Sequence, residues 1–226
     1  MRHSSRDGCY LQAPTYRLLK KDAFGRTELI TRASSRLVRR DASCAARPVR
    51  WLARRLLERE ARALAVLVDL DGIPELLRVD DLVLEREYLA GVPMQVGKPG
   101  DVRYFHAASK LLRRLHRHGI AHNDLAKEPN LLVTEAGMPA LIDFQLSSYS
   151  PRRSALFRLL AREDIRHLLK HKRTYCREKL TARERRILES PSWLSRLWMA
   201  TGKPTYLFVT RNILGWEDRE GAGDRV

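Results

Sequence analysis

A run of polar side chains after Gly119 has the composition of a site for metal-bound phosphate. The segment GIAHNDLAKEPN carries carboxylate, amide, imidazole and ammonium groups, and another aspartate follows the next apolar run. Carboxylate and amide oxygens are the ligands that Mg²⁺ prefers, and a carboxylate beside a hydroxyl can orient it and accept its proton. The residues that such chemistry would use are His122, Asn123, Asp124, Lys127, Asn130 and Asp143.

A helix and a hairpin must position this loop. Apolar residues recur at helical spacing over 104–118, and Gly119 is a typical helix end. The segment NLLVTEAGMPALIDF contains two apolar runs around Gly137 and Pro139, which predicts a hairpin. Asn130 and Asp143 are 13 positions apart, a separation that one tight hairpin spans, so both could reach one metal ion.

Short strands and one helix are predicted upstream of the loop. Alternating patterns bounded by turn residues predict strands within 16–32, 34–41, 73–79 and 82–89, and a helical pattern that begins at Pro48 continues to about residue 68. A connection rich in Gly and Pro follows at 91–101. Downstream, helices are predicted at 152–171 and 181–190, with a further segment at 193–216 before a polar tail.

The ordered motifs resemble those of the protein-kinase-like superfamily. HND at 122–124 resembles the kinase HRD motif, Asn130 resembles the asparagine of the same loop, and DFQ at 143–145 resembles DFG. The similarity covers roughly residues 15 to 170 and is greatest to the compact atypical branch near RIO kinases and bacterial lipopolysaccharide kinases. It implies an α+β fold of two lobes, with a small antiparallel sheet and one helix in the N-lobe and a mainly helical C-lobe.

This resemblance implies a domain layout and roles for the loop residues. Residues 1–90 would form the nucleotide-binding N-lobe, 91–101 the hinge or linker, and 102–226 the C-lobe, within one kinase-like domain. Asp124 would orient or deprotonate the acceptor hydroxyl, and Lys127 would reach the transferred phosphate. Asn130 and Asp143 would hold Mg²⁺ on the phosphates of ATP.

The resemblance also implies roles for residues of the N-lobe. The strand RLVRRD offers Arg39 and Arg40 where kinases have a phosphate-binding lysine, and alternation lets only one point inward. Arg39 is preferred because it is in phase with Leu37, and Arg40 is nearly equal. Glu60, with Glu58 as the fallback, would pair with that arginine. LEREYLAG resembles the hinge that lines an adenine pocket, at Glu87 to Leu89.

The sequence also departs from the kinase pattern. Asp124 and Asn130 are 6 positions apart, one more than the HRDxxxxN template allows. No glycine-rich loop precedes the arginine strand, so Lys20 and Lys21 or backbone amides would have to contact the nucleotide. Almost no activation segment follows Asp143, which argues against an ordinary peptide platform. Asp164 has two readings, as a support beneath the polar loop or as a solvated helix residue.

Charge and cysteine content limit the remaining choices. The formal net charge of +16 favours phosphate-rich partners, although an arginine-rich composition would produce it too. The cysteines lack disulfide or zinc spacing, and no apolar run is long enough to span a bilayer. We therefore expect a cytoplasmic phosphotransferase, which leaves open a peripheral position on the anionic inner membrane surface. Its partners would be ATP and a hydroxyl acceptor, on a protein Ser or Thr or an envelope sugar or lipid.

The sequence is also compatible with two other functions. A pseudokinase would keep the fold and bind nucleotide or partner proteins without transferring phosphate, and the missing glycine-rich loop favours it. A basic nucleic-acid-binding protein would use the loop only structurally, and its binding to RNA or DNA would depend steeply on salt.

Overall fold

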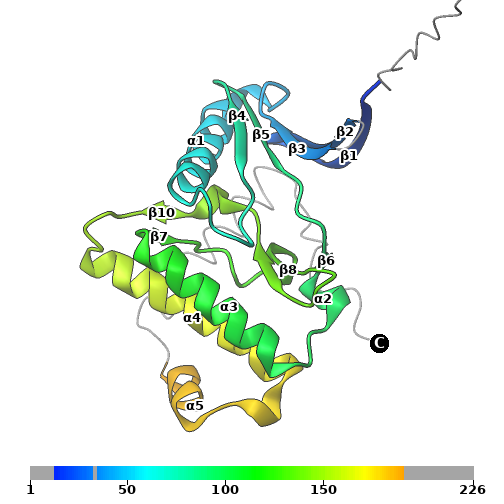
Figure 1. Cartoon of the computed structure of the whole chain (residues 1–226). Coiled ribbons are helices and arrows are strands. Elements are labelled where there is room, and N and C mark those ends of the chain that lie inside the picture. The colour runs from blue at the N-terminus through cyan, green and yellow to red at the C-terminus, as the bar shows by residue number, and fades with distance from the viewer. Residues whose placement is uncertain (1–12, 33–34, 191–226) are drawn as a thin grey trace, which may run out of the picture. The chain divides into compact units, whose positions relative to one another are not determined.

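The computed structural model describes residues 13–32 and 35–190, which belong to two units (Figure 1). The first unit ends at Leu180 and is α+β, with an antiparallel sheet near its N-terminus and most of its helices after it. The second begins at Thr181, and its described part is the helix α5 (Ala182–Glu189), capped by Thr181 and Glu184. The helix predicted at 181–190 is confirmed. The segment predicted at 193–216 and the polar tail lie outside the described residues.

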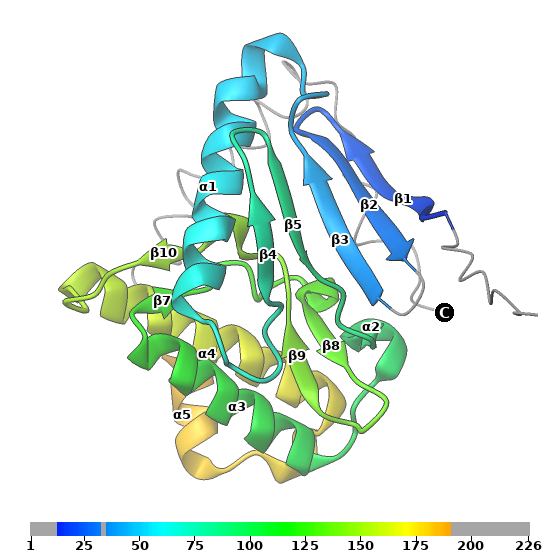
Figure 2. The ribbon, with the colours of Figure 1, turned by 45° about the horizontal axis from the view of Figure 1, so that its top comes forward.

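Five antiparallel strands in the order β1-β2-β3-β5-β4 form the main sheet (Figure 2). The strands are β1 (Thr15–Asp22), β2 (Gly25–Arg32), β3 (Ser35–Asp41), β4 (Leu76–Val79) and β5 (Val83–Glu87). A tight turn joins β1 and β2. Its Gly25 has φ +126°, and a Cβ there would collide with the carbonyl of Asp41, so the turn requires glycine.

The helix α1 (Arg50–Val66) packs against this sheet. A 3₁₀ turn at Arg47–Val49, which contains Pro48, precedes it. The helix start predicted at Pro48 is therefore two residues before the observed start at Arg50. Small and branched residues fill the contact between α1 and the sheet, namely Ala42, Ala45, Ala53, Leu57, Ala61 and Leu84. Because Leu84 belongs to this cluster, the face of β5 that carries Leu84 is the face toward α1.

The predicted linker is structured rather than open. It contains β6 (Val92–Pro93) and the short helix α2 (Met94–Gly97). β6 pairs with β8 (Leu131–Val133), which in turn pairs with β9 (Pro139–Leu141), so the hairpin predicted after the polar loop is confirmed and gains a third strand. Met94 is fully buried in the main hydrophobic core. These contacts attach the connection firmly to the hairpin.

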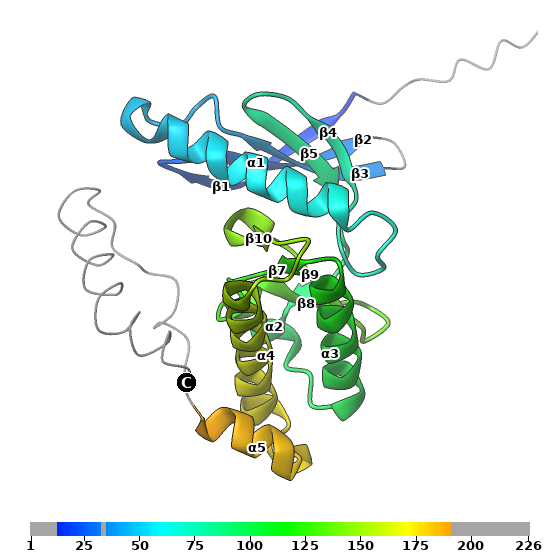
Figure 3. The ribbon, with the colours of Figure 1, turned by 90° about the vertical axis from the view of Figure 1, so that its left-hand side faces the viewer.

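Two long helices, α3 (Val102–Arg117) and α4 (Ala155–Tyr175), lie side by side (Figure 3). Asp101 caps α3 and Ser154 caps α4, each by accepting a hydrogen bond from a backbone N–H of the first turn. The apolar face of α3 enters the main core, as its periodicity predicted. Among the described residues, no helix is both long and apolar enough to cross a membrane.

A small ladder lies between α1 and the pair α3 and α4 in Figure 3. It pairs β7 (Ile120–Ala121), just before the polar loop, with β10 (Ser148–Tyr149), just after the predicted DFQ turn. The sequence did not predict this ladder because each of its strands has only two residues. Its effect is to bring both ends of the candidate site together.

Candidate active site

Asp164 holds the polar loop from beneath. Its carboxylate accepts hydrogen bonds from the backbone N–H groups of His122 and Asn123, both at 2.8 Å, and from His116 Nε2 at 3.1 Å. The Asp164 side chain is 1% exposed, so these bonds replace all of its water contacts. Of the two readings of Asp164, the structure supports the one in which it positions the loop, and the solvated one is wrong.

The His122 ring connects this loop to the DFQ turn. Its Nε2 lies 3.0 Å from the carbonyl oxygen of Ile142 and therefore donates a hydrogen bond to it. The imidazole centroid is also 4.6 Å from that of Phe144, a side chain with no solvent exposure. These two contacts fix the backbone on both sides of Asp143.

Asp124 and Asn130 contact each other despite the extra residue in their spacing. Asn130 Nδ2 donates to both the backbone oxygen and Oδ2 of Asp124, at 2.9 Å in each case. Lys127 Nζ is 3.2 Å from the same Oδ2. A 3₁₀ turn at Glu128–Asn130 takes up the added length. Burial raises the pKa of Asp124 above its ordinary value, although Lys127 and Asn130 work in the opposite direction.

Side chains of α4 make further hydrogen bonds to this loop that were not predicted from the sequence. Tyr175 donates its hydroxyl hydrogen bond to Glu128 Oε2 at 2.7 Å, and burial together with Glu128 raises the pKa of Tyr175 to about 12. His171 Nε2 donates to the carbonyl oxygen of Leu125 at 2.7 Å, and its Nδ1 is 3.7 Å from Glu128 Oε1. The only sequence signal was the spacing of His171 and Tyr175 on one face of α4.

Asp143 has a left-handed backbone, with φ +66°. Gln145 Nε2 donates to its Oδ1 at 2.8 Å, and Arg40 Nη2 is 3.7 Å from the same oxygen. Burial acts to raise the pKa of Asp143, but the positive charges of Arg40, Arg86 and Lys127 outweigh it and lower that pKa below its ordinary value. Asp143 is therefore harder to protonate than Asp124.

Arg40, rather than the preferred Arg39, approaches Glu60. Arg40 Nε lies 3.4 Å from Glu60 Oε2, whereas Arg39 Nε lies 4.0 Å from Glu85 Oε1 across the sheet. The apolar pattern could not select the face of β3, because its neighbouring residues Leu37 and Val38 are both buried.

Arg86 is a residue of this cluster that sequence analysis missed. Its Nε lies 3.2 Å from Glu60 Oε1, and burial lowers the pKa of the Arg86 guanidinium despite the attraction of Glu60. Arg86 could have been found from its alternation with the buried Leu84. Both Glu60 oxygens are buried and within ion-pair distance of a guanidinium, yet neither accepts a well-aligned hydrogen bond.

Other predicted residues lie apart from this cluster. Glu58 is on an exposed face of α1 and pairs with Arg54 at 3.0 Å. Glu87 Oε2 accepts a hydrogen bond from the backbone N–H of Glu75, and Leu89 is half-buried in the following segment. Lys20 pairs with Asp22 at 3.3 Å, and Lys21 is exposed. None of these ion pairs or hydrogen bonds joins them to Asp124 or Asp143.

The donor set suits a metal ion that is shared with phosphates. Within residues 13–32 and 35–190, no group of three or more His, Cys, Asp or Glu side chains is arranged to hold a metal by itself. Asp143 and Asn130 nevertheless offer hard oxygens, and Mg²⁺ is commonly held by one or two such groups together with substrate phosphates. The residues present therefore fit Mg²⁺ bound with a nucleotide rather than a metal site made of protein alone.

Comparison with known proteins yields no assignment. Neither the protein-family models nor the curated proteins contain a match to this chain.

Proposed function

We propose that this chain is an ATP- and Mg²⁺-dependent phosphotransferase with a two-lobed, protein-kinase-like fold. One observation carries the proposal: contacts run from Glu60 through Arg40 to Asp143, which lies close enough to Asp124 for its charge to raise the pKa of Asp124. Four groups from distant parts of the chain thus meet at one place. This is the set that phosphoryl transfer requires for gripping phosphate, holding metal and orienting an acceptor.

The positive groups would bind the phosphates. Asp143 and Asn130 would hold Mg²⁺, which supplies charge neutralisation on the phosphate oxygens when bound. Arg40 would grip the phosphates with its planar guanidinium, positioned by Glu60, and Lys127 would contact the phosphoryl group that is transferred. Lys127 suits this role because its side chain is 62% exposed and already lies beside Asp124.

Asp124 would orient the acceptor hydroxyl and take its proton. The upward shift in its pKa, caused mainly by burial, makes the carboxylate a better proton acceptor than a solvated aspartate. Asn130 fixes the carboxylate through Oδ2, so the group is held in one orientation. Phosphoryl transfer depends more on such positioning than on a strong base. The acceptor class in this proposal is a protein Ser or Thr or an envelope sugar or lipid.

The order of elements supports the fold assignment. An antiparallel sheet with one helix precedes a helical region, and the segment at 91–101 joins them. In this proposal residues 1–90 are the N-lobe, and 102–226 the C-lobe. The backbone around Glu87 and Leu89 would contact the adenine ring.

A second candidate is a nucleotide-binding module without transfer activity. The observation that favours it is the occupation of Asp143 Oδ1 by both Gln145 and Arg40. If these contacts persist when nucleotide is bound, Asp143 has only its other oxygen for metal. The short β1–β2 turn also gives fewer backbone amides for phosphates than a glycine-rich loop would.

Turnover of ATP separates the candidates. The full chain is incubated with Mg²⁺ and γ-labelled ATP, and both phosphate release and self-labelling are measured. We expect Asp124→Asn to lower the rate by about a hundred- to ten-thousand-fold, and Asp143→Asn to remove Mg²⁺-dependent turnover. Asp71→Asn is the matched control because Asp71 is exposed on the loop after α1. Turnover that is unchanged in both site variants would rule out the proposal, and Mg·ATP binding without turnover in the wild type would favour the second candidate.

A further inference from the structure

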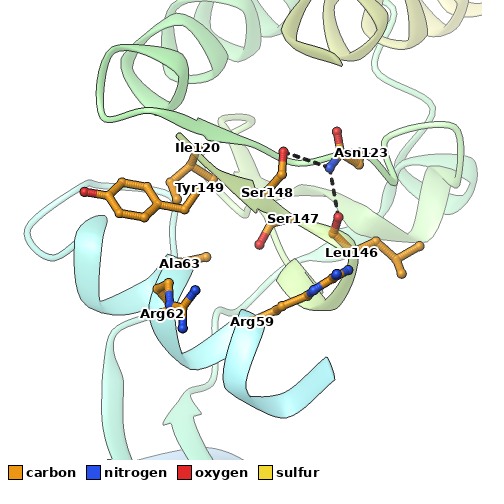
Figure 4. Close-up of a pocket in the computed structure, with 9 residues that line it drawn as sticks. All are labelled: Arg59, Arg62, Ala63, Ile120, Asn123, Leu146, Ser147, Ser148 and Tyr149. Atoms are coloured by element: carbon orange, nitrogen blue, oxygen red, sulfur yellow. Dashed lines mark hydrogen bonds between the residues drawn. The ribbon is translucent and has the colours of Figure 1, made fainter. Parts of the chain in front are cut away.

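A pocket of about 240 Å³ lies between α1 and the β7–β10 ladder (Figure 4). It is separate from the cluster of Arg40, Glu60 and Asp143, and none of those three residues lines it. Its walls are formed by Arg59, Arg62, Ala63, Ile120, Asn123, Leu146, Ser147, Ser148 and Tyr149. This pocket has no role in the proposed phosphotransfer.

The α1 wall of the pocket is positively charged. Arg59 and Arg62 are three positions apart and therefore lie on the same side of the helix. Neither forms an ion pair with any residue in the described ranges, in contrast to Arg54 on the same helix, which pairs with Glu58 and Asp81. No acidic residue lines the pocket. Both arginines are exposed and line the pocket, so two guanidinium groups border a space that has no acidic side chain in its walls.

The opposite wall supplies a hydroxyl without a protein partner. Ser147 is 5% exposed, and its backbone N–H donates to the carbonyl oxygen of Phe144. Its side-chain Oγ has no hydrogen-bond partner among the described residues, and Figure 4 shows it directed toward the α1 side of the pocket. The Ser147 hydroxyl is not one of the buried polar atoms without a partner, so it is accessible from the pocket and can donate a hydrogen bond to a ligand there.

Asn123 keeps this wall in place. Its Nδ2 donates to the carbonyl oxygen of Leu146 at 2.9 Å and to Ser148 Oγ at 3.2 Å. The corresponding position in the kinase motif is an arginine, whereas here an uncharged amide ties the loop directly to the segment after Asp143. The serine wall is therefore formed without any ligand, while Asn123 Oδ1 is a buried acceptor without a hydrogen-bond partner.

We propose that this pocket binds a phosphate group carried by a small-molecule or peptide ligand. Arginine forks match the oxygen geometry of phosphate, and two of them balance the charge of a phosphomonoester dianion. The Ser147 hydroxyl adds a donor from the opposite wall. A neutral ligand would leave both positive charges uncompensated, and a cation would be repelled.

Binding here would act on the neighbouring cluster, and this part of the inference depends on the proposed function. Arg59 is adjacent in sequence to Glu60, whose oxygens lie near Arg40 and Arg86 without aligned hydrogen bonds. A phosphate that joins Arg59 and Arg62 to Ser147 holds α1 against the β7–β10 ladder. The ligand thereby fixes the position of Glu60 and of the arginine that grips ATP.

Binding of inorganic phosphate to the full chain tests the site without requiring turnover. Titrations are made by calorimetry at constant ionic strength, in a buffer free of other oxyanions. We expect Arg59→Gln and Arg62→Gln each to weaken binding about tenfold, as the loss of a charge-assisted hydrogen bond implies. Arg55→Gln is the matched control, because Arg55 is an exposed arginine on the same helix that does not line the pocket.

Lys127→Gln distinguishes this pocket from the proposed phosphotransfer site. Phosphate affinity that survives Lys127→Gln and Arg55→Gln but falls in both pocket variants supports the inference, even if ATP turnover is never found. Equal weakening by Arg55→Gln would show a general charge effect, and unchanged affinity in both pocket variants would show binding elsewhere; either result overturns the inference.

Hydrogen exchange supplies the second readout. With phosphate present, backbone amides of α1 and β10 should exchange more slowly in the wild type. In the variant that combines Arg59→Gln with Arg62→Gln, phosphate should leave their exchange rates unchanged. Slowing that is equal in the two proteins would contradict the proposed bridge between α1 and the ladder.

Discussion

The two sides of the candidate site are held in different ways. On the loop side, Asp164 and Asn130 make hydrogen bonds of 2.8 to 2.9 Å to the segment that carries Asp124. On the sheet side, Arg40 and Arg86 approach Glu60 at 3.4 and 3.2 Å but without hydrogen-bond alignment. The hydrogen bonds thus hold the loop in one conformation. The distances between Glu60 and the two arginines can still shorten.

This difference has a physical cause. A buried carboxylate that accepts backbone N–H groups, as Asp164 does, satisfies both partners at fixed geometry. Two neighbouring guanidinium groups repel each other, and the charge of Arg40 contributes to lowering the pKa of Arg86. A bound polyanion such as a nucleoside triphosphate would offset that repulsion with its negative charge. We therefore expect the loop side to determine stability and the sheet side to respond to ligand.

Removing the Asp164 carboxylate should produce the largest effect. Asp164→Ala leaves two backbone N–H groups and His116 without their buried acceptor. We expect a loss of about 3–5 kcal/mol in the free energy of unfolding, measured by chemical denaturation. Asp164→Asn keeps one acceptor oxygen and should lose less. A loss below about 1 kcal/mol in Asp164→Ala would mean that the loop is not held from beneath.

Removing the charge of Glu60 should have the next largest effect. Glu60→Gln leaves Arg40 and Arg86 close together without their anion, and the Glu60 side chain has no solvent exposure. We expect about 2–4 kcal/mol of destabilisation, because half of a buried ion pair is lost. Glu58→Gln is the matched control, since its pair with Arg54 is exposed, and it should cost less than about 0.5 kcal/mol. Equal effects of the two variants would contradict the assigned cluster.

Opposite shifts in two pKa values predict the pH dependence of the proposed turnover. Burial raises the pKa of Asp124, whereas Arg40, Arg86 and Lys127 overcome burial to lower that of Asp143. In the proposed reaction the ionised form of Asp124 accepts the proton, so we expect activity above its pKa and a fall of about tenfold per pH unit below it. The acid limb of kcat/KM should therefore lie above the ordinary aspartate pKa of 3.8. An acid limb below that value would exclude Asp124 as the titrating group.

The smallest effect should come from Arg39. Arg39→Gln removes a partly exposed partner 4.0 Å from Glu85, on the face of β3 opposite Arg40. We expect less than about 1 kcal/mol of change in stability and unchanged Mg·ATP affinity. Arg40→Gln, the matched comparison, should weaken Mg·ATP binding. If Arg39→Gln weakens binding as much as Arg40→Gln does, the assignment of Arg40 to the phosphates is wrong.

Sequence periodicity predicted the regular elements well. The helices α1, α3 and α4, the strands of the main sheet and the β8–β9 hairpin lie close to their expected positions, because each buries one clear apolar face. The ladder of β7 and β10 could not be predicted in this way. Its pairing depends on tertiary contacts of two-residue strands that have no periodicity of their own.

The candidate site was predictable only in part. The polar residues of the loop were found from their types, but the side of β3 that faces α1 was not, because buried residues occur on both of its faces. Arg86 was missed because its charge suggested a surface position, although its alternation with Leu84 places it on the same face of β5. The contacts of His171 and Tyr175 with the loop join positions more than forty residues apart, and no local pattern indicates such pairs.

Calorimetric binding of Mg·ATP to the full chain, compared with Asp143→Asn, tests the central claim most directly. We predict binding that requires Mg²⁺, is lost on adding a chelator, and weakens at least about tenfold in Asp143→Asn, because a carboxylate that holds the metal is removed. Affinity that is the same with and without Mg²⁺, and the same in both proteins, would contradict the account.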